Sequence, residues 1–178
     1  MKKIFSYIFL ICLLLLVGCN ELSKYDDEDV AAIIRGEELT IGELRFLYPD
    51  DKVLENLDGT IKAKLVKQEV KAMNIDVSKE LQEIEEKKSE VDIYSSKEVD
   101  TETANGMREF SESQSAKFEM EPEKYHEEYL EMTQETTVYL VSYIEAMIGD
   151  GMDDPETENQ LLNDLVEDNK AEIQIFIE

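Results

Sequence analysis

The chain is poor in the side chains that build most catalytic and metal sites. Its 178 residues include one histidine, two cysteines and no tryptophan. Cys12 lies inside an apolar N-terminal run, so a chain that has lost this run keeps Cys19 alone. A disulfide, thiol catalysis and a cysteine metal site are then excluded. We expect no catalytic residue, no metal and no cofactor, and therefore a protein that is not an enzyme.

The single histidine, His126, does not change this expectation. It is surrounded by Lys124, Glu127 and Glu128 in a stretch of helical character. A catalytic histidine needs a nucleophile or a second base within hydrogen-bond reach, and the sequence indicates neither. We interpret His126 as an exposed helix residue.

Basic residues are also scarce, since 18 lysines and arginines stand against 43 acidic residues, for a net charge of −25. This charge repels nucleic-acid phosphates and disfavours flat docking on anionic lipid. We therefore expect no nucleic-acid partner, and no small-molecule substrate. Apolar residues nevertheless make up 42% of the chain, too many for a wholly disordered acidic protein. A single α-rich domain fits this composition.

The N-terminal apolar run, residues 4–17, is shorter than the about 20 residues that cross a bilayer core. It follows Lys2 and Lys3, and a basic start with an apolar core is typical of a secretory signal. We predict a signal peptide over residues 1–18. Without Lys2 and Lys3, the chain keeps 16 basic against 43 acidic side chains, a net charge of −27.

The end of this run, Leu16-Val17-Gly18-Cys19, resembles the lipobox of bacterial lipoproteins. The resemblance implies cleavage between Gly18 and Cys19 and a diacylglyceryl group on the Cys19 thiol. Acyl chains hold a protein at a membrane because each buried methylene contributes about 0.8 kcal/mol. We predict a lipid anchor at the extracytoplasmic face of the cell membrane. An acidic tether over residues 19–29, a solvated spacer, would follow it.

Local signals define most of the expected helices. Residues 57–73 carry an apolar face at helical spacing, Asn74 can end that helix, and Ser78 can cap the next one over 79–90. Thr40 and Glu43 form a capping box for a helix from Ile41 that stops before Pro49. Further helices are predicted over 122–148 and from residue 155, with a mobile connection at about 92–106.

The two ends of the domain contain β-branched residues. Val30–Ile34 is a short apolar run, and residues 173–177 alternate. These segments can pair as two strands, although the second can equally be the end of the last helix. We therefore predict a mainly α fold with a possible small two-strand β element near the termini.

Three stretches resemble the N-terminal domain of the SurA/PrsA-type extracytoplasmic chaperones. Residues 30–44 match the pattern "VAxVNGxxITxxEL", with Arg35 in place of the usual Asn. Residues 61–78 resemble a helix of the form "LIxxKLLxxEAKKxGI" that runs into "xVSxxEVxxxI", with Asn74 in place of the usual Gly. Residues 120–129 resemble the start of the closing helix, "GxTxxEYxxxY", with Glu121 in place of the usual Thr. The resemblance implies a single SurA-N-like helical domain over residues 30–178 that binds unfolded or newly exported polypeptides.

Some members of this family also carry a parvulin-type prolyl isomerase domain between these parts. Here only residues 92–119 lie between them, far fewer than the roughly 100 residues of an ordinary domain. The resemblance therefore implies the chaperone-like domain without isomerase activity.

One stripe of the 122–148 helix is rich in tyrosine and methionine. We favour core packing for it. The functional alternative is a client-binding cradle, since methionine is adaptable and tyrosine combines apolar area with a polar edge. Two further functions stay open: a structural or interaction lipoprotein that holds one dedicated cell-surface partner, and acidic cation binding, for which residues 150–154 are a poor match to a calcium loop. The candidate client-binding residues are Tyr125, Tyr129, Met132, Tyr139, Tyr143 and Met147.

Overall fold

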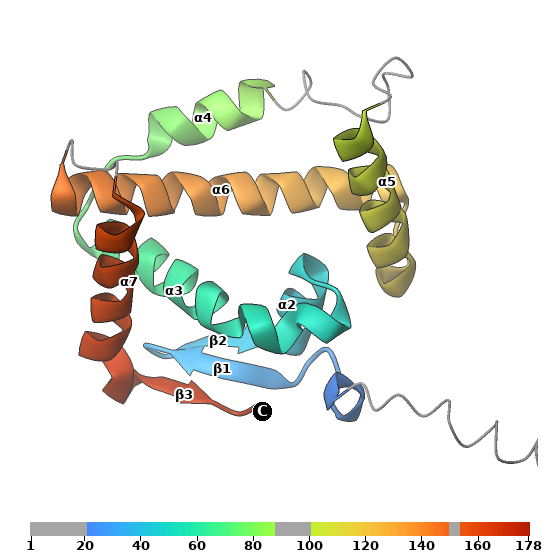
Figure 1. Ribbon diagram of the computed structural model, residues 1–178, viewed down its shortest axis with the longest axis horizontal. Coiled ribbons are helices and arrows are strands. Elements are labelled where there is room, and N and C mark those ends of the chain that lie inside the picture. The colour runs from blue at the N-terminus through green and yellow to red at the C-terminus, as the bar shows by residue number, and fades with distance from the viewer. Residues whose placement is uncertain (1–20, 88–100, 150–153) are drawn as a thin grey trace, which may run out of the picture.

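The computed structural model describes residues 21–87, 101–149 and 154–178. These residues form a mainly helical fold with one small antiparallel sheet, which confirms the predicted fold class. In Figure 1, α3 lies between the sheet and the long helix α6. The elements are η1 (Glu21–Lys24), β1 (Val30–Ile34), β2 (Glu37–Thr40), α2 (Ile41–Leu47), η2 (Asp50–Lys52), α3 (Val53–Ala72), α4 (Ser78–Lys87), α5 (Glu102–Ser115), η3 (Ala116–Phe118), α6 (Pro122–Ile148), α7 (Pro155–Asn169), η4 (Lys170–Glu172) and β3 (Ile173–Ile175).

The sheet has the strand order β2-β1-β3. Pairing of β1 with β3 confirms the strand alternative for the last segment, while β2 adds a third strand that the sequence did not indicate. Both residues of the β1–β2 turn have positive φ, 49° at Arg35 and 81° at Gly36. A two-residue turn of this kind matches the twist of a hairpin.

The Arg35 side chain ties this hairpin to two helices. Its Nη2 atom lies 2.5 Å from Glu69 Oε1 of α3, and its Nε donates to Asn169 Oδ1 of α7 at 2.8 Å. A left-handed backbone is unfavourable for a residue with a Cβ. The ionic and hydrogen-bonded contacts of Arg35 offset that cost.

Helix α3 supplies the centre of the core. Ile61, Leu65, Val66 and Val70 are buried, as its helical spacing predicts, and the helix begins at Val53, earlier than expected. Asn74 has φ of 56°, which confirms the predicted left-handed stop. The predicted cap of the next helix, α4, is wrong, because Ser78 is the first residue of α4 and not the residue before it. The Asp76 carboxylate accepts the Ser78 amide at 3.0 Å.

Three other local predictions are confirmed. The Thr40 and Glu43 side chains make both hydrogen bonds of the capping box at the start of α2. Helix α6 runs from Pro122 to Ile148 and ends at Gly149 with φ of 65°. The Asp154 carboxylate accepts the Glu156 amide at 3.2 Å and caps α7.

The predicted connection at 92–106 is wrong over its last residues. Its first part lies outside the described residues, but α5 begins at Glu102, where the Thr101 hydroxyl accepts the Ala104 amide. The buried face of α5 consists of Ala104, Ser111, Gln114 and Ser115. Small and polar residues produce no hydrophobic periodicity, so the first turns of this helix could not be recognised from the local pattern.

Candidate functional site

The tyrosine and methionine stripe of α6 is largely core. Tyr125, Tyr139 and Tyr143 are buried, Tyr129 and Met132 are half-buried, and Met147 is 47% exposed at the end of the helix. This confirms the core interpretation for the three buried tyrosines. The burial follows from the packing of α3, α4 and α5 around α6, which leaves little of the stripe at the surface.

Tyr125 joins α6 to α2 at one end of this core. Its hydroxyl donates to the Phe46 carbonyl at 2.5 Å, and its ring lies 4.8 Å from the Phe46 ring, centroid to centroid. The rings of Phe110, Phe118 and Tyr129 lie within 6.3 Å of it. Burial raises the pKa of the Tyr125 hydroxyl above its ordinary value of 10.0.

The interpretation of His126 as exposed is wrong. The side chain is only 5% exposed, because α5 packs on this part of α6, and its Nδ1 atom lies 3.3 Å from the Ser111 hydroxyl.

The predicted spacer is also wrong for residues 22–29, although the side chains of residues 26–29 are exposed, as expected for a solvated acidic run. Leu22 is 1% exposed and belongs to the main core. The Ile41 amide donates to Asp29 O and the Gly42 amide to Asp27 O, both at 2.9 Å. A Cβ on residue 42 would lie 3.0 Å from Asp27 O, so the glycine permits this close backbone approach. The acidic run is therefore part of the folded domain.

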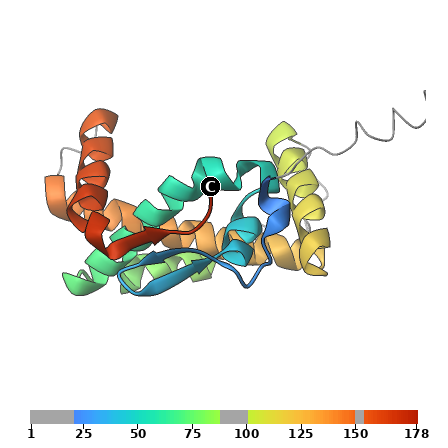
Figure 2. The ribbon, with the colours of Figure 1, turned by 90° about the horizontal axis from the view of Figure 1, so that it is seen from below.

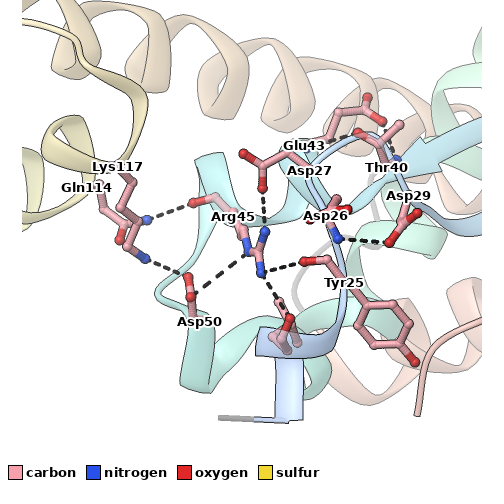
Figure 3. Close-up of polar contacts among 11 residues, drawn as sticks. Tyr25, Asp26, Asp27, Asp29, Thr40, Glu43, Arg45, Asp50, Gln114 and Lys117 are labelled. Carbon is pink, nitrogen blue, oxygen red and sulfur yellow. Dashed lines mark hydrogen bonds and ion pairs between the residues drawn. The ribbon is translucent and has the colours of Figure 1, made fainter.

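Arg45 holds this N-terminal segment in place, as Figure 3 shows. Its guanidinium donates to the carbonyls of Leu22 at 3.0 Å and Tyr25 at 3.1 Å, and it pairs with the Asp27 carboxylate at 2.5 Å. We call these contacts the Arg45 clamp. The Arg45 carbonyl in turn accepts from Gln114 of α5 at 2.9 Å, so the clamp joins the N-terminal segment, α2 and α5.

The clamp positions one side of an open apolar groove. Tyr25, Asp29, Val30, Ile33 and Phe176 line it, and its volume is about 440 Å³. We call it the β1–β3 groove. Side chains alternate along a strand, so Ile33 points away from Ala32 and Ile34, which are buried. The groove therefore lies on the sheet face opposite the core, and in Figure 2 β1 and β3 lie in front of α6.

The C-terminal segment carries the two most exposed large apolar side chains among the described residues, of which Phe176 lines the groove and Ile175 lies on the other face of the sheet, opposite Ala32. Ile175 is 53% exposed and Phe176 51% exposed. Both belong to the segment that the sequence predicted as a strand, but the prediction gave no reason to regard it as a binding surface. The participation of Tyr25 was missed because residues 19–29 were read as a spacer.

The described residues were also compared with the requirements of a metal site and of a membrane span. They contain no group of three or more histidine, cysteine or acidic side chains arranged to hold a metal ion. Residues 150–153 of the calcium-like stretch, and Gly18 and Cys19, lie outside the described ranges. None of the described helices combines the length and hydropathy needed to span a bilayer.

Comparison with family models, curated proteins and solved structures finds no match to this chain. The SurA/PrsA resemblance therefore stays a prediction from the residues that carry it.

The Arg45 clamp predicts a specific effect of Arg45→Lys. Lysine keeps the charge but cannot reach two carbonyls and a carboxylate at once, so the free energy of unfolding should fall by about 1–3 kcal/mol. The Ile41 and Gly42 amides, which donate to the clamped segment, should exchange hydrogen faster. Urea unfolding and hydrogen exchange measure the two effects. Arg108→Lys on α5 is the matched control, and unchanged exchange at Ile41 and Gly42 would contradict the clamp.

Tyr125 predicts a fall in stability in alkali. Because its pKa is raised in the folded state, the unfolded chain loses this proton first, so its contribution is complete below about pH 10 and is lost as the pH rises above that value. Tyr125→Phe should cost about 1 kcal/mol near neutral pH and make the alkaline fall shallower. Burial also raises the pKa values of Tyr129 and Tyr143, which keep part of the slope. Urea unfolding at a series of pH values around and above 10 measures this dependence. If the free energy of unfolding of Tyr125→Phe falls with pH as steeply as that of the wild type, the prediction is refuted.

Proposed function

We propose that this protein is a lipid-anchored, extracytoplasmic lipoprotein that binds unfolded or newly exported polypeptides. The observation that carries the proposal is the β1–β3 groove. Its lining side chains are mainly apolar, and an open lining of this kind can receive an apolar side chain of a partner. Unfolded polypeptides present apolar segments of this kind.

The composition of the β1–β3 groove favours loose recognition over a defined small ligand. Its lining is apolar apart from Asp29 and the Tyr25 hydroxyl. Pockets that select one small molecule fix its orientation with several convergent polar groups. An open groove with few such groups suits many polypeptide segments. The SurA/PrsA resemblance supports the same class of function.

The start of the folded domain supports action close to the membrane. Leu22, a core residue, follows Cys19 by three positions. Three extended residues span at most about 10 Å. An acylated Cys19 would therefore hold Tyr25 and the β1–β3 groove near the bilayer, where exported chains emerge. This arrangement replaces the spacer that the sequence had suggested.

A dedicated cell-surface partner is the second candidate function. The Arg45 clamp and the β1–β3 pairing hold the groove on ordered elements, and a fixed groove also suits one partner of matching shape. The range of polypeptides that bind separates the two candidates.

Suppression of aggregation tests the binding function. The full chain in lipid nanodiscs should slow the aggregation of several unrelated denatured proteins, followed by light scattering. Phe176→Ser removes apolar area from the groove and should abolish about half of the effect or more. Met147→Ser is the matched control, since Met147 is similarly exposed on α6 and belongs to the predicted client stripe.

Each other outcome of this assay has a defined meaning. If the wild type suppresses the aggregation of one denatured protein only, the dedicated-partner function is favoured. An equal loss in Met147→Ser would move the binding surface to α6. No suppression by the wild type would overturn the chaperone-like function. Far-ultraviolet circular dichroism verifies that both variants stay helical.

Lipidation is tested separately. Cells supplied with an alkyne-tagged fatty acid should label the wild-type protein and retain it in the membrane fraction. Cys19→Ala should lose the label and leave that fraction, because the thiol is the acceptor in the predicted lipobox. Cys12→Ala, inside the predicted signal peptide, is the matched control and should keep both properties. Labelling of Cys19→Ala would show that the anchor lies elsewhere.

A further inference from the structure

β3 is an edge strand with backbone groups directed away from its partner. In the described part of the chain, β1 is the strand that pairs with it. The Arg35 amide donates to Glu172 O and the Phe176 amide to Ala31 O, both at 2.9 Å. In an antiparallel pair, every second residue of a strand directs its amide and carbonyl groups at the partner strand, and the residues between them direct these groups away from it. Since Glu172 and Phe176 bond to the chain of β1, the amide and carbonyl groups of Ile173 and Ile175 point toward the open edge.

We infer that this edge of β3 binds the client as an added antiparallel or parallel strand, and that the client segment is extended and rich in apolar and basic side chains. The inference rests on the proposed function and names its binding mode. Exposed strand edges bind peptides through main-chain hydrogen bonds, while neighbouring pockets select side chains. Here the backbone groups of Ile173 and Ile175 supply the hydrogen bonds, and the β1–β3 groove receives apolar side chains.

The exposed side chains around the edge favour an apolar segment. Ile175 lies opposite Ala32, and Phe176 lines the groove on the other face of β3. An added strand would therefore meet apolar area on both of its faces. β3 has the sequence Ile-Gln-Ile, without the lysine or proline that often protects an edge strand, so its protection is limited to its short length and the flanking Glu172. Its three residues limit the contact to a short segment.

The surrounding charges select a basic segment over a second copy of the chain. Glu172 and Glu178 flank the strand and are exposed, Asp29 lines the groove, and Glu38 lies opposite Ile33 in β2. Two lysines lie nearby: Lys24 is over the Tyr25 ring, 5.0 Å from its centroid, and Lys170 pairs with Glu167. A second copy would bring the same acidic edge and its own charge of −25 against this surface. Like charges oppose that pairing, and lysine or arginine in the client favours it.

Three short fluorescent peptides test the binding mode on the full chain in lipid nanodiscs, with fluorescence anisotropy as the measurement. The first alternates valine and lysine, the second is the same peptide with N-methyl groups on alternate amides, and the third alternates valine and glutamate. The first should bind. The second loses main-chain hydrogen bonds and the third meets like charge, so each should bind at least about tenfold more weakly.

A pair of protein variants tests the same edge from the other side. Ile175→Pro removes an amide that points outward and leaves the hydrogen bonds to β1 in place, which an edge strand tolerates. Its affinity for the valine–lysine peptide should be about tenfold lower than that of Ile175→Ala. Ile175→Ala also shortens the side chain but keeps the amide. Circular dichroism and thermal unfolding check that both variants fold, and the N-methylated peptide tests the mode without any protein variant.

The outcomes separate this inference from the proposed function. Equal binding of the N-methylated peptide would overturn strand addition, and equal binding of the valine–glutamate peptide would overturn the preference for basic segments. If the protein suppresses aggregation but does not bind the valine–lysine peptide, strand addition is overturned and the chaperone-like function is retained. If the wild-type protein neither suppresses aggregation nor binds the peptide, the proposed function is overturned as well. Concentration-dependent dimers that Ile175→Pro dissociates would assign the edge to a second copy and overturn the inference.

Discussion

The fold depends on the burial of α3 on more than one side. The helix packs against β1, α6 and α7, and Leu65, Val66 and Val70 are almost completely removed from water. One neighbouring element is too narrow to bury an apolar surface that extends this far around a helix. In Figure 1 the sheet lies on one side of α3, α6 on the opposite side, and α7 at one end of α3. No α-helix of the described ranges covers the opposite face of the sheet, and the β1–β3 groove lies there.

Two arginines stabilise this arrangement in a chain dominated by acidic residues. Arg35 joins the β1–β2 hairpin to α3 and α7, and Arg45 joins the N-terminal segment to α2. Each contacts carbonyl, amide or carboxylate oxygens from distant parts of the sequence. Such contacts are stronger than exposed surface pairs because the side chains are partly removed from solvent. The scarcity of cations thus concentrates their structural role at a few junctions.

The sequence predicted those features that depend on neighbouring residues. The capping box at Thr40, the stop at Asn74 and the start of α6 at Pro122 are each specified within one helical turn. The errors concern contacts between distant residues. His126 is buried because α5 covers it, and the segment 22–29 is held in the fold because Arg45 binds the carbonyls of Leu22 and Tyr25. Neither partner can be read from the local pattern. The candidate site was missed for the same reason, since its lining combines Tyr25 with Phe176.

The pairing of β1 with β3 also constrains the order in which the fold can be completed. β1 begins at Val30, whereas β3 begins at Ile173 and follows every other described element. Contacts between such distant segments form late, because a long loop must first close. Until β3 docks, β1 itself presents an apolar edge to its surroundings. A nascent chain of this protein would thus pass through a state that resembles the polypeptides it is proposed to bind, and its last strand ends that exposure.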